Sequence, residues 1–437
     1  MEYAAFWMFP ALLLLIFLGY HVAFSLASVA FVFGLITYGD IFIWQLVGRV
    51  ESIATNFVLA AVPLFVFMGA LLERSGIAER LFSAIHLWTN RLPGGLAVAT
   101  IVMCVIFACS TGVIGATETV VGLLAIPPML RHNYCKKLIS GSICAGGSLG
   151  TIIPPSVVLI VMGPLAEVSI GRLFAGAMIP GLLLAGLYLL YVLLLCFIRP
   201  SAGPPAPAQE EALSFSEKVA VTIRALLPPA FLIVAVLGSI LAGVASPTEA
   251  AAVGGAGALL LVVASGNLTW RILLETMMKT LTITTMIMFI LMAGTMFTGV
   301  FFSMGGSSLI SGSVQSLGLG PWELLFVVLA LALVLGFFLE WISILMIFIP
   351  IFTPLILASG FDPVWFCILF LVIIQTGYLT PPMAPAIFYL RGIAPPEITI
   401  SAMYSGVVPF LVIQGILLGL LMIFPGLVLW LPKVLFG

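Results

Sequence analysis

Charged side chains are scarce in this sequence. Among 437 residues there are 15 Lys and Arg and 16 Asp and Glu, so 7% of the chain is charged while 63% is hydrophobic. A soluble domain carries about 25% charged residues, because its surface must be hydrated. The composition therefore excludes a soluble enzyme and a disordered scaffold, and it predicts a polytopic membrane protein. A formal net charge of −1 also provides no field that would attract a nucleic acid.

Patterns for catalysis and metal binding are missing as well. The six cysteines form no Cys-x-x-Cys pair and the three histidines are scattered, so the sequence suggests neither a zinc site nor a haem site. No Walker motif occurs, which excludes ATP hydrolysis by that route. The first apolar run has no basic segment before it, so we expect no cleaved signal peptide. We therefore expect neither enzymatic activity nor a bound organic cofactor.

Long apolar runs are abundant. Residues 182–198 and 324–339 are apolar on all sides, which favours bundled helices over the alternating strands of a barrel. We predict an all-α polytopic membrane protein with a polar loop at 73–91 and Gly/Ser-rich chain at 303–320. The chain is expected to divide into N-terminal scaffold spans with an interface helix (1–91), a first repeat core (92–199), a Pro-rich linker (200–217), second-half scaffold spans (218–320), a second repeat core (321–400) and a C-terminal span (401–437).

Lysines and arginines indicate how two of the apolar segments enter the membrane. Cytoplasmic loops are rich in these residues, and segment 92–130 has them at both ends. This segment would therefore begin and end on the cytoplasmic side, either as two short crossings or as a re-entrant helical hairpin. Segment 321–358 has no Lys or Arg near either end, so it would begin and end on the outer side. The two interrupted segments are thus predicted to enter from opposite faces.

Three landmarks recur in the same order in the two halves: a glutamate inside apolar chain, an Ile-Pro pair and a Gly-x-x-x-Pro-Pro motif. The copies are 222, 223 and 227 residues apart, respectively. Paired Gly/Pro interruptions in corresponding halves indicate a transporter's binding site, and opposite entry faces fit an inverted repeat. The motifs would interrupt helices at about 138–163 and 363–387, and the first helix is also expected to break at Gly146-Gly147. The landmarks are Glu118, Ile126-Pro127 and Gly150–Pro155 in the first half, and Glu340, Ile349-Pro350 and Gly377–Pro382 in the second.

Broken helices have a chemistry that suits ion and anion binding. Free N–H and C=O groups at membrane depth are costly unless something binds them. Half-helix N-termini favour carboxylates, exposed carbonyls favour Na⁺, and each Pro-Pro pair removes two backbone donors. The candidate substrate- and Na⁺-binding residues are the hydroxyl, amide, carboxylate, glycine and proline positions beside these breaks: Ser110, Thr111, Gly112, Gly115, Thr117, Glu118, Gly150, Thr151, Pro154, Pro155, Gly336, Glu340, Gln375, Gly377, Thr380, Pro381 and Pro382.

Two of the scarce charges lie at matching places of the repeat, inside apolar chain. A charged side chain at the bilayer centre costs roughly 2.5–3.5 kcal/mol on insertion scales. Glu118 and Glu340 therefore have two open interpretations. They are ligands of a coupling ion or proton, or they are structural glutamates that hydrogen-bond to neighbouring backbone.

Several ordered stretches resemble the large membrane subunit of tripartite ATP-independent periplasmic (TRAP) transporters, the DctM-like family, over nearly the whole chain. The resemblance implies an inverted-repeat, elevator-type transporter with two re-entrant helical hairpins, at about 92–130 and 321–358, and two unwound helices. It places the hairpin tips at 110–118 and 336–340. The stretches are AVPLFVFMGALLE (61–73), GTIIPPS (150–156), GRLFAGAMIPGLLLAGLY (171–188), GFFLE (336–340), IPIFTP (349–354), GFDP (360–363) and GYLTPP (377–382).

The resemblance also implies partners and a location. They are a small four-helix TRAP membrane subunit, a periplasmic substrate-binding protein that delivers an organic acid anion, and the lipid bilayer of a bacterial inner membrane. Na⁺ would be the coupling ion, near Ser110, Thr151, Glu340 and Thr380. The alternative is a stand-alone carboxylate carrier or antiporter of the wider ion-transporter superfamily, which would have no small partner subunit.

Overall fold

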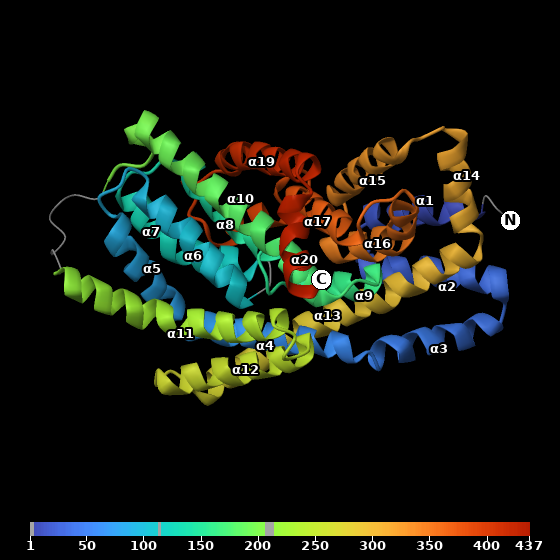
Figure 1. Ribbon diagram of the computed structural model, residues 1–437, viewed down its shortest axis with the longest axis horizontal. Coiled ribbons are helices and arrows are strands. Elements are labelled where there is room, and N and C mark those ends of the chain that lie inside the picture. The colour runs from blue at the N-terminus through green and yellow to red at the C-terminus, as the bar shows by residue number, and fades with distance from the viewer. Residues whose placement is uncertain (1–3, 112–114, 206–213) are drawn as a thin grey trace.

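The structure of the protein, a computed structural model, describes residues 4–111, 115–205 and 214–437. These residues form helices joined by short turns, in agreement with the all-α prediction (Figure 1). Within the described ranges, seven helices are long and apolar enough to cross a membrane, judged by length and composition. Shorter apolar helices lie between them, so the chain has several apolar spans.

The N-terminal region contains a helix where the sequence predicted a loop. Stretch 73–91 includes α5, whose Ile77, Leu81 and Ile85 are buried at the i, i+4, i+8 spacing of one helix face. The loop prediction was wrong because Arg80, one of the charges that suggested it, lies on the exposed face of this amphipathic helix. The elements are α1 (Ala4–Phe17), α2 (Val22–Tyr38), α3 (Ile41–Ala54), the 3₁₀ turn η1 (Phe57–Ala60), α4 (Ala61–Arg74) and α5 (Ile77–Thr89).

The next region is a pair of helices followed by an interrupted helix. The predicted break at Gly146-Gly147 is wrong, because α8 continues through both glycines, which allow neighbouring side chains to approach the helix closely. The interruption lies at 152–156, around a cis peptide bond between Pro154 and Pro155. The elements are α6 (Gly95–Thr111), α7 (Ala116–Arg131), α8 (Lys136–Ser148), η2 (Leu149–Thr151), α9 (Val157–Ala166) and α10 (Ile170–Ile198).

The middle of the chain is more helical than its composition suggested. Helix α11 begins at Phe215, inside the predicted linker 200–217, because Ser214 and Glu217 form a capping box. The Gly/Ser-rich stretch 303–320 contains α14, where serine hydroxyls donate to carbonyls one turn earlier and so remain compatible with a helix. The elements are η3 (Pro200–Ala202), α11 (Phe215–Leu241), α12 (Pro247–Ala264), α13 (Trp270–Ser303) and α14 (Gly306–Ser316).

The last region repeats the order of a helix pair and an interrupted helix. Here the interruption is Thr380–Ala384, and the peptide bond between Pro381 and Pro382 is cis. The single C-terminal span predicted over 401–437 is instead two helices, because the chain leaves helical geometry at Phe424 and a proline follows. The elements are α15 (Pro321–Gly336), α16 (Trp341–Ala358), α17 (Pro363–Leu379), α18 (Pro385–Ile393), α19 (Ile400–Ile423) and α20 (Gly426–Phe436).

The two helix-pair regions, here called the first core (α6–α10) and the second core (α15–α20), interlock. Helix α9, after the first interruption, packs on α16, and α18, after the second, packs on α7. In Figure 1, α6 and α7 lie toward one end of the long axis and α15 and α16 toward the other. Helices α3, α4, α11, α12 and α13 form a layer along one side, here called the lateral layer (Figure 1). Helices α5 and α14 have matching places, since each connects this layer to a helix pair.

Candidate functional site

A cavity of about 860 Å³ lies where the two cores meet the lateral layer. On the core side, its walls are the turn before α7, the turn between α15 and α16, and the interruption between α17 and α18. On the other side, they are the turn between α1 and α2, the end of α4 and one face of α13. Small-molecule sites usually enclose about 300–1,000 Å³, so this cavity has the size of a substrate site.

The second interruption opens into the cavity. Tyr378, Pro382 and Met383 line it, and both Pro381 and Pro382 are exposed. Thr380, half-buried, donates its hydroxyl proton to the carbonyl of Thr376 at 2.7 Å. A hydroxyl that donates in this way keeps its oxygen lone pairs available to a cation or a donor.

The first interruption is closed. Residues 150–156 are all buried, which includes Gly150, Thr151, Pro154 and Pro155. The Thr151 hydroxyl donates to the carbonyl of Ser148 at 2.8 Å, and the Ser156 hydroxyl donates to the carbonyl of Thr151 at 2.7 Å. The two interruptions, similar in sequence, therefore differ in accessibility: the second faces a cavity and the first lies in packed protein.

Glu118 is enclosed at the tip of the first helix pair. Its Oε2 accepts a hydrogen bond of 2.7 Å from the N–H of Gly115, the N-cap residue of α7. Its Oε1 has no hydrogen-bond partner among the described residues. The side chain packs directly on Gly147 of α8, where a Cβ would lie 2.5 Å from the Glu118 Cδ. One carboxylate oxygen thus binds the start of α7, and the other has no partner in the part of this tip that the structure describes.

The remaining candidate positions of this tip are only partly described. Ser110 and Thr111 are the last residues of α6, and Gly112 lies outside the described ranges. Thr117 is buried in the first turn of α7. Gly115 lines the cavity and lies against the Tyr389 ring of α18. The second core therefore contributes a side chain to the tip of the first.

Glu340 faces the cavity, in contrast to Glu118. It is the N-cap residue of α16, its side chain forms no capping hydrogen bond, and it is half-buried. Behind it, Gly336 packs against Gly377 of α17, where a Cβ would lie 3.2 Å from the Gly336 carbonyl oxygen. The tip of the second helix pair therefore approaches α17 closely.

Gln375 joins the two interrupted helices. Its Nε2 donates to the Ser148 Oγ at 3.1 Å, and these two residues are 227 positions apart, which is also the separation of the Pro-Pro motifs. Residues related by the repeat thus touch one another. Buried Tyr188 lies beside both Ser148 and Gln414, and Oε1 of Gln375 has no hydrogen-bond partner among the described residues.

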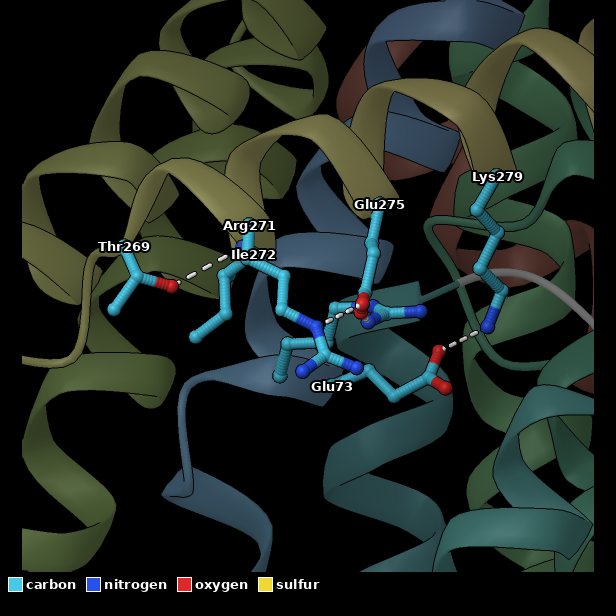
Figure 2. Close-up of polar contacts among 7 residues, drawn as sticks. Glu73, Thr269, Arg271, Ile272, Glu275 and Lys279 are labelled. Carbon is cyan, nitrogen blue, oxygen red and sulfur yellow. Dashed lines mark hydrogen bonds and ion pairs between the residues drawn. The ribbon is translucent and has the colours of Figure 1, made fainter.

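The cavity wall also contains an ion pair that the sequence did not reveal. Figure 2 shows the carboxylate of Glu73, on α4, and the ammonium of Lys279, on α13, pointing toward one another. The Arg74–Glu275 pair joins the same two helices, and Arg271 also contacts Glu275, at 2.8 Å. Among these residues, Glu73 and Lys279 line the cavity.

The structure brings some predicted site residues together and separates others. Gly115, Gly336, Glu340 and Pro382 line the cavity, as does the previously unrecognised Tyr378. Tyr378 lies inside the GYLTPP motif, so its position was a signal that could have indicated it. The enclosed positions are Thr117, Glu118, Gly150, Thr151, Pro154, Pro155, Gln375 and Gly377.

Residues 9–427 match the family model for the DctM component of tripartite ATP-independent periplasmic transporters. The chain is 30% identical over 379 residues to the C4-dicarboxylate TRAP transporter large permease protein DctM of Pseudomonas aeruginosa, covering 86% of this chain and 87% of that protein. It is 31% identical over 428 residues to the sialic acid TRAP transporter large permease protein SiaM of Vibrio cholerae, with 97% of each covered. The solved structure of the Alcanivorax borkumensis YdaH transporter is similar with a TM-score of 0.62, 18% identity and 89% of each chain covered. That likeness confirms the all-helical membrane fold.

Proposed function

The chain belongs to the DctM family, the large permease components of TRAP transporters, and from this premise we propose that it imports an organic acid anion by Na⁺-coupled secondary transport. Family membership confirms the resemblance indicated by the ordered motifs, and it makes the chain a multi-pass membrane permease rather than an enzyme. A periplasmic substrate-binding protein would deliver the anion, and a small four-helix membrane subunit would complete the transporter. The complex would reside in the bacterial inner membrane.

The position of the cavity carries the proposal of an elevator mechanism. Its walls come from two bodies, with the tips of both helix pairs and the second interruption on one side and the lateral layer with the α1–α2 turn on the other. In an elevator, the cores would move past a fixed scaffold, and a substrate bound at their boundary would change the side from which it is reached. The repeat-related crossing of α9 and α18 supports two inverted repeats that move as one body.

The hydroxyl groups at both interruptions support Na⁺ coupling. Thr151 and Thr380 each donate to a carbonyl three or four residues earlier, so their oxygens present lone pairs to a hard cation. Glu340 adds a carboxylate at the cavity wall. We propose Na⁺ sites near Ser110 and Thr151 in the first core and near Glu340 and Thr380 in the second.

The distribution of basic residues supports an orientation for the cavity. Three helices, α4, α7 and α10, end at or next to an arginine, namely Arg74, Arg131 and Arg199. Two helices, α8 and α13, begin with a basic residue in the first turn, Lys136 and Arg271. We assign this end of the molecule, here called the basic end, to the cytoplasm. The first helix pair would then enter from the cytoplasm and the second from the periplasm.

Uptake by reconstituted transporter tests the proposal. Proteoliposomes would contain both membrane subunits, with the binding protein outside, and organic acids such as a C4-dicarboxylate and a sialic acid would be offered, since relatives are named for them. We expect uptake that depends on an inward Na⁺ gradient. Undiminished uptake with neither a Na⁺ gradient nor a membrane potential would refute Na⁺ coupling. Purification of an active permease without a small partner subunit would favour a stand-alone carrier.

Replacing Thr380 by valine is expected to raise the Na⁺ concentration for half-maximal uptake about fivefold, because it removes one oxygen ligand at nearly constant volume. Expression should be unchanged. The matched control is Thr376→Val, which removes the equivalent hydroxyl hydrogen bond, to Val372, one turn earlier in α17. A Thr380→Val protein with wild-type Na⁺ dependence and rate would argue against the second ion site.

A further inference from the structure

The charged groups around the cavity are unevenly distributed. Of the described residues that line it, Lys279 is the single lysine or arginine. The acidic and imidazole side chains among the described lining residues are Glu73, Glu340 and His21. Two carboxylates repel an anion, and a cation in the wall offsets that repulsion for a carboxylate-bearing cargo. Among the described lining residues, Lys279 is the basic side chain that can do so.

Lys279 lies at one end of the cavity. Together with Ile283, Met286 and Ile287 it lines one face of α13, and these eight residue steps correspond to about 12 Å of helix. Lys279 is the member of this row closest to Arg271 and therefore to the basic end of the molecule. An anion that moves along this face toward the basic end passes Lys279 after the other three residues of the row.

The Lys279 ammonium forms an ion pair but remains partly accessible. Its side chain is 27% exposed and that of Glu73 is 15% exposed, and both residues line the cavity. An ammonium in such a place binds either the local carboxylate or that of a passing anion. Glu73 therefore competes with the cargo for Lys279.

The neighbouring ion pairs show that α4 and α13 do not depend on the Glu73–Lys279 pair alone to stay together. Arg74–Glu275 already joins α4 to α13, and Arg271 reinforces it from within α13. Neither arginine lines the cavity. The two pairs thus form a natural comparison, because they connect the same helices and differ in their access to the cavity.

We propose that the Glu73–Lys279 pair is an anion-selective exit. Lys279 attracts the carboxylate of the cargo toward the basic end, and Glu73 displaces it from the ammonium so that release is not slowed by a tight ion pair. That the cargo is an organic anion rests on the proposed function. The electrostatic part of the proposal is independent of transport.

Charged thiol reagents measure the potential at this exit directly. The probe position is Ile283→Cys, one turn deeper on the cavity-lining face of α13, in a background with Cys109→Ala and Cys135→Ser, since the other four native cysteines are buried. In the purified complex, the labelling rate with 2-sulfonatoethyl methanethiosulfonate is divided by the rate with its trimethylammonium analogue. The same background with Ile283 retained gives the rate of unspecific labelling.

The two single variants are expected to change this ratio in opposite directions. Lys279→Gln should lower the anion-to-cation ratio about fivefold and Glu73→Gln should raise it about fivefold, since each removes one charge near the probe. In the double variant, the labelling ratio should return close to its starting value. The single variant Lys279→Gln leaves the Glu73 charge unpaired and could fold poorly for that reason, whereas the double variant leaves neither charge. If Lys279→Gln does not fold, the labelling ratios of Glu73→Gln and of the double variant are compared instead. These two proteins differ only at position 279, so their difference measures the effect of the Lys279 charge.

The neighbouring pair supplies the control. Arg74→Gln combined with Glu275→Gln should leave the ratio within about twofold of the starting value, because neither residue lines the cavity. Equal ratios in the Glu73 and Lys279 variants would overturn the proposal, even if organic anion uptake were intact. A shifted ratio in a protein that transports no organic anion would leave the electrostatic exit standing and refute the proposed cargo instead.

Discussion

Gly147→Ala is expected to lower uptake about 10²-fold, because it displaces a group at the tip of the first helix pair. An alanine Cβ at this position would lie 2.5 Å from both Cγ and Cδ of Glu118. Glu118 would have to move, and its hydrogen bond to the N–H of Gly115 would break. We also expect a stability loss of ~2 kcal/mol, typical of overpacking in a well-packed core. Thermal unfolding in detergent and uptake in proteoliposomes measure the two effects.

A second substitution tests whether that contact is the cause. Glu118→Asp shortens the side chain, so in the Gly147→Ala background it should recover part of the lost thermal stability. The matched glycine control is Gly186→Ala, because that Cβ on α10 would meet no atom within 4 Å. If Gly186→Ala harms the protein as much as Gly147→Ala does, or if Glu118→Asp recovers nothing, the packing of Glu118 on Gly147 is not what maintains the tip.

Gly147 also illustrates what could be predicted from the sequence and what could not. The order of helix pairs and interruptions follows from apolar runs and Pro-Pro motifs, because proline removes backbone donors wherever the chain folds. A Gly-Gly pair, in contrast, does not by itself determine whether the helix continues or breaks. Gly146 and Gly147 were predicted to break α8, but tertiary packing uses them to admit Cys104 and Glu118. Which of these outcomes applies depends on neighbours that are distant in sequence.

The candidate site, too, could be predicted from the sequence only in part. The matching motifs at Gly150–Pro155 and Gly377–Pro382 predicted two corresponding helix interruptions at a binding site, yet of the two only the second faces the cavity. Accessibility depends on where the lateral layer lies relative to the cores, and no local pattern encodes that. The Glu73–Lys279 pair was missed for a related reason, since 206 residues separate its members and each resembled an ordinary charge at the end of a helix.

Tyr378→Phe is expected to weaken the apparent affinity for the transported anion about 30-fold, the equivalent of ~2 kcal/mol for a hydrogen bond to a charged group. Tyr378 lines the cavity, is 6% exposed, and its hydroxyl has no hydrogen-bond partner among the described residues. A buried hydroxyl without a hydrogen-bond partner costs free energy. A ligand that accepts a hydrogen bond from it recovers this free energy on binding. A carboxylate is the acceptor that the proposed cargo would provide.

The stability of the empty protein should respond differently to the same change. Phenylalanine fills the same space without an unpaired polar atom, so Tyr378→Phe should leave the unfolding temperature unchanged or raise it. Opposite effects on affinity and stability distinguish a ligand-binding hydroxyl from a structural one, whose loss would reduce both. Tyr404→Phe on α19, which does not line the cavity, should change neither quantity. Binding of a C4-dicarboxylate or sialic acid, measured by calorimetry on the purified complex, gives the affinity, and an unchanged value in Tyr378→Phe would remove this tyrosine from the substrate site.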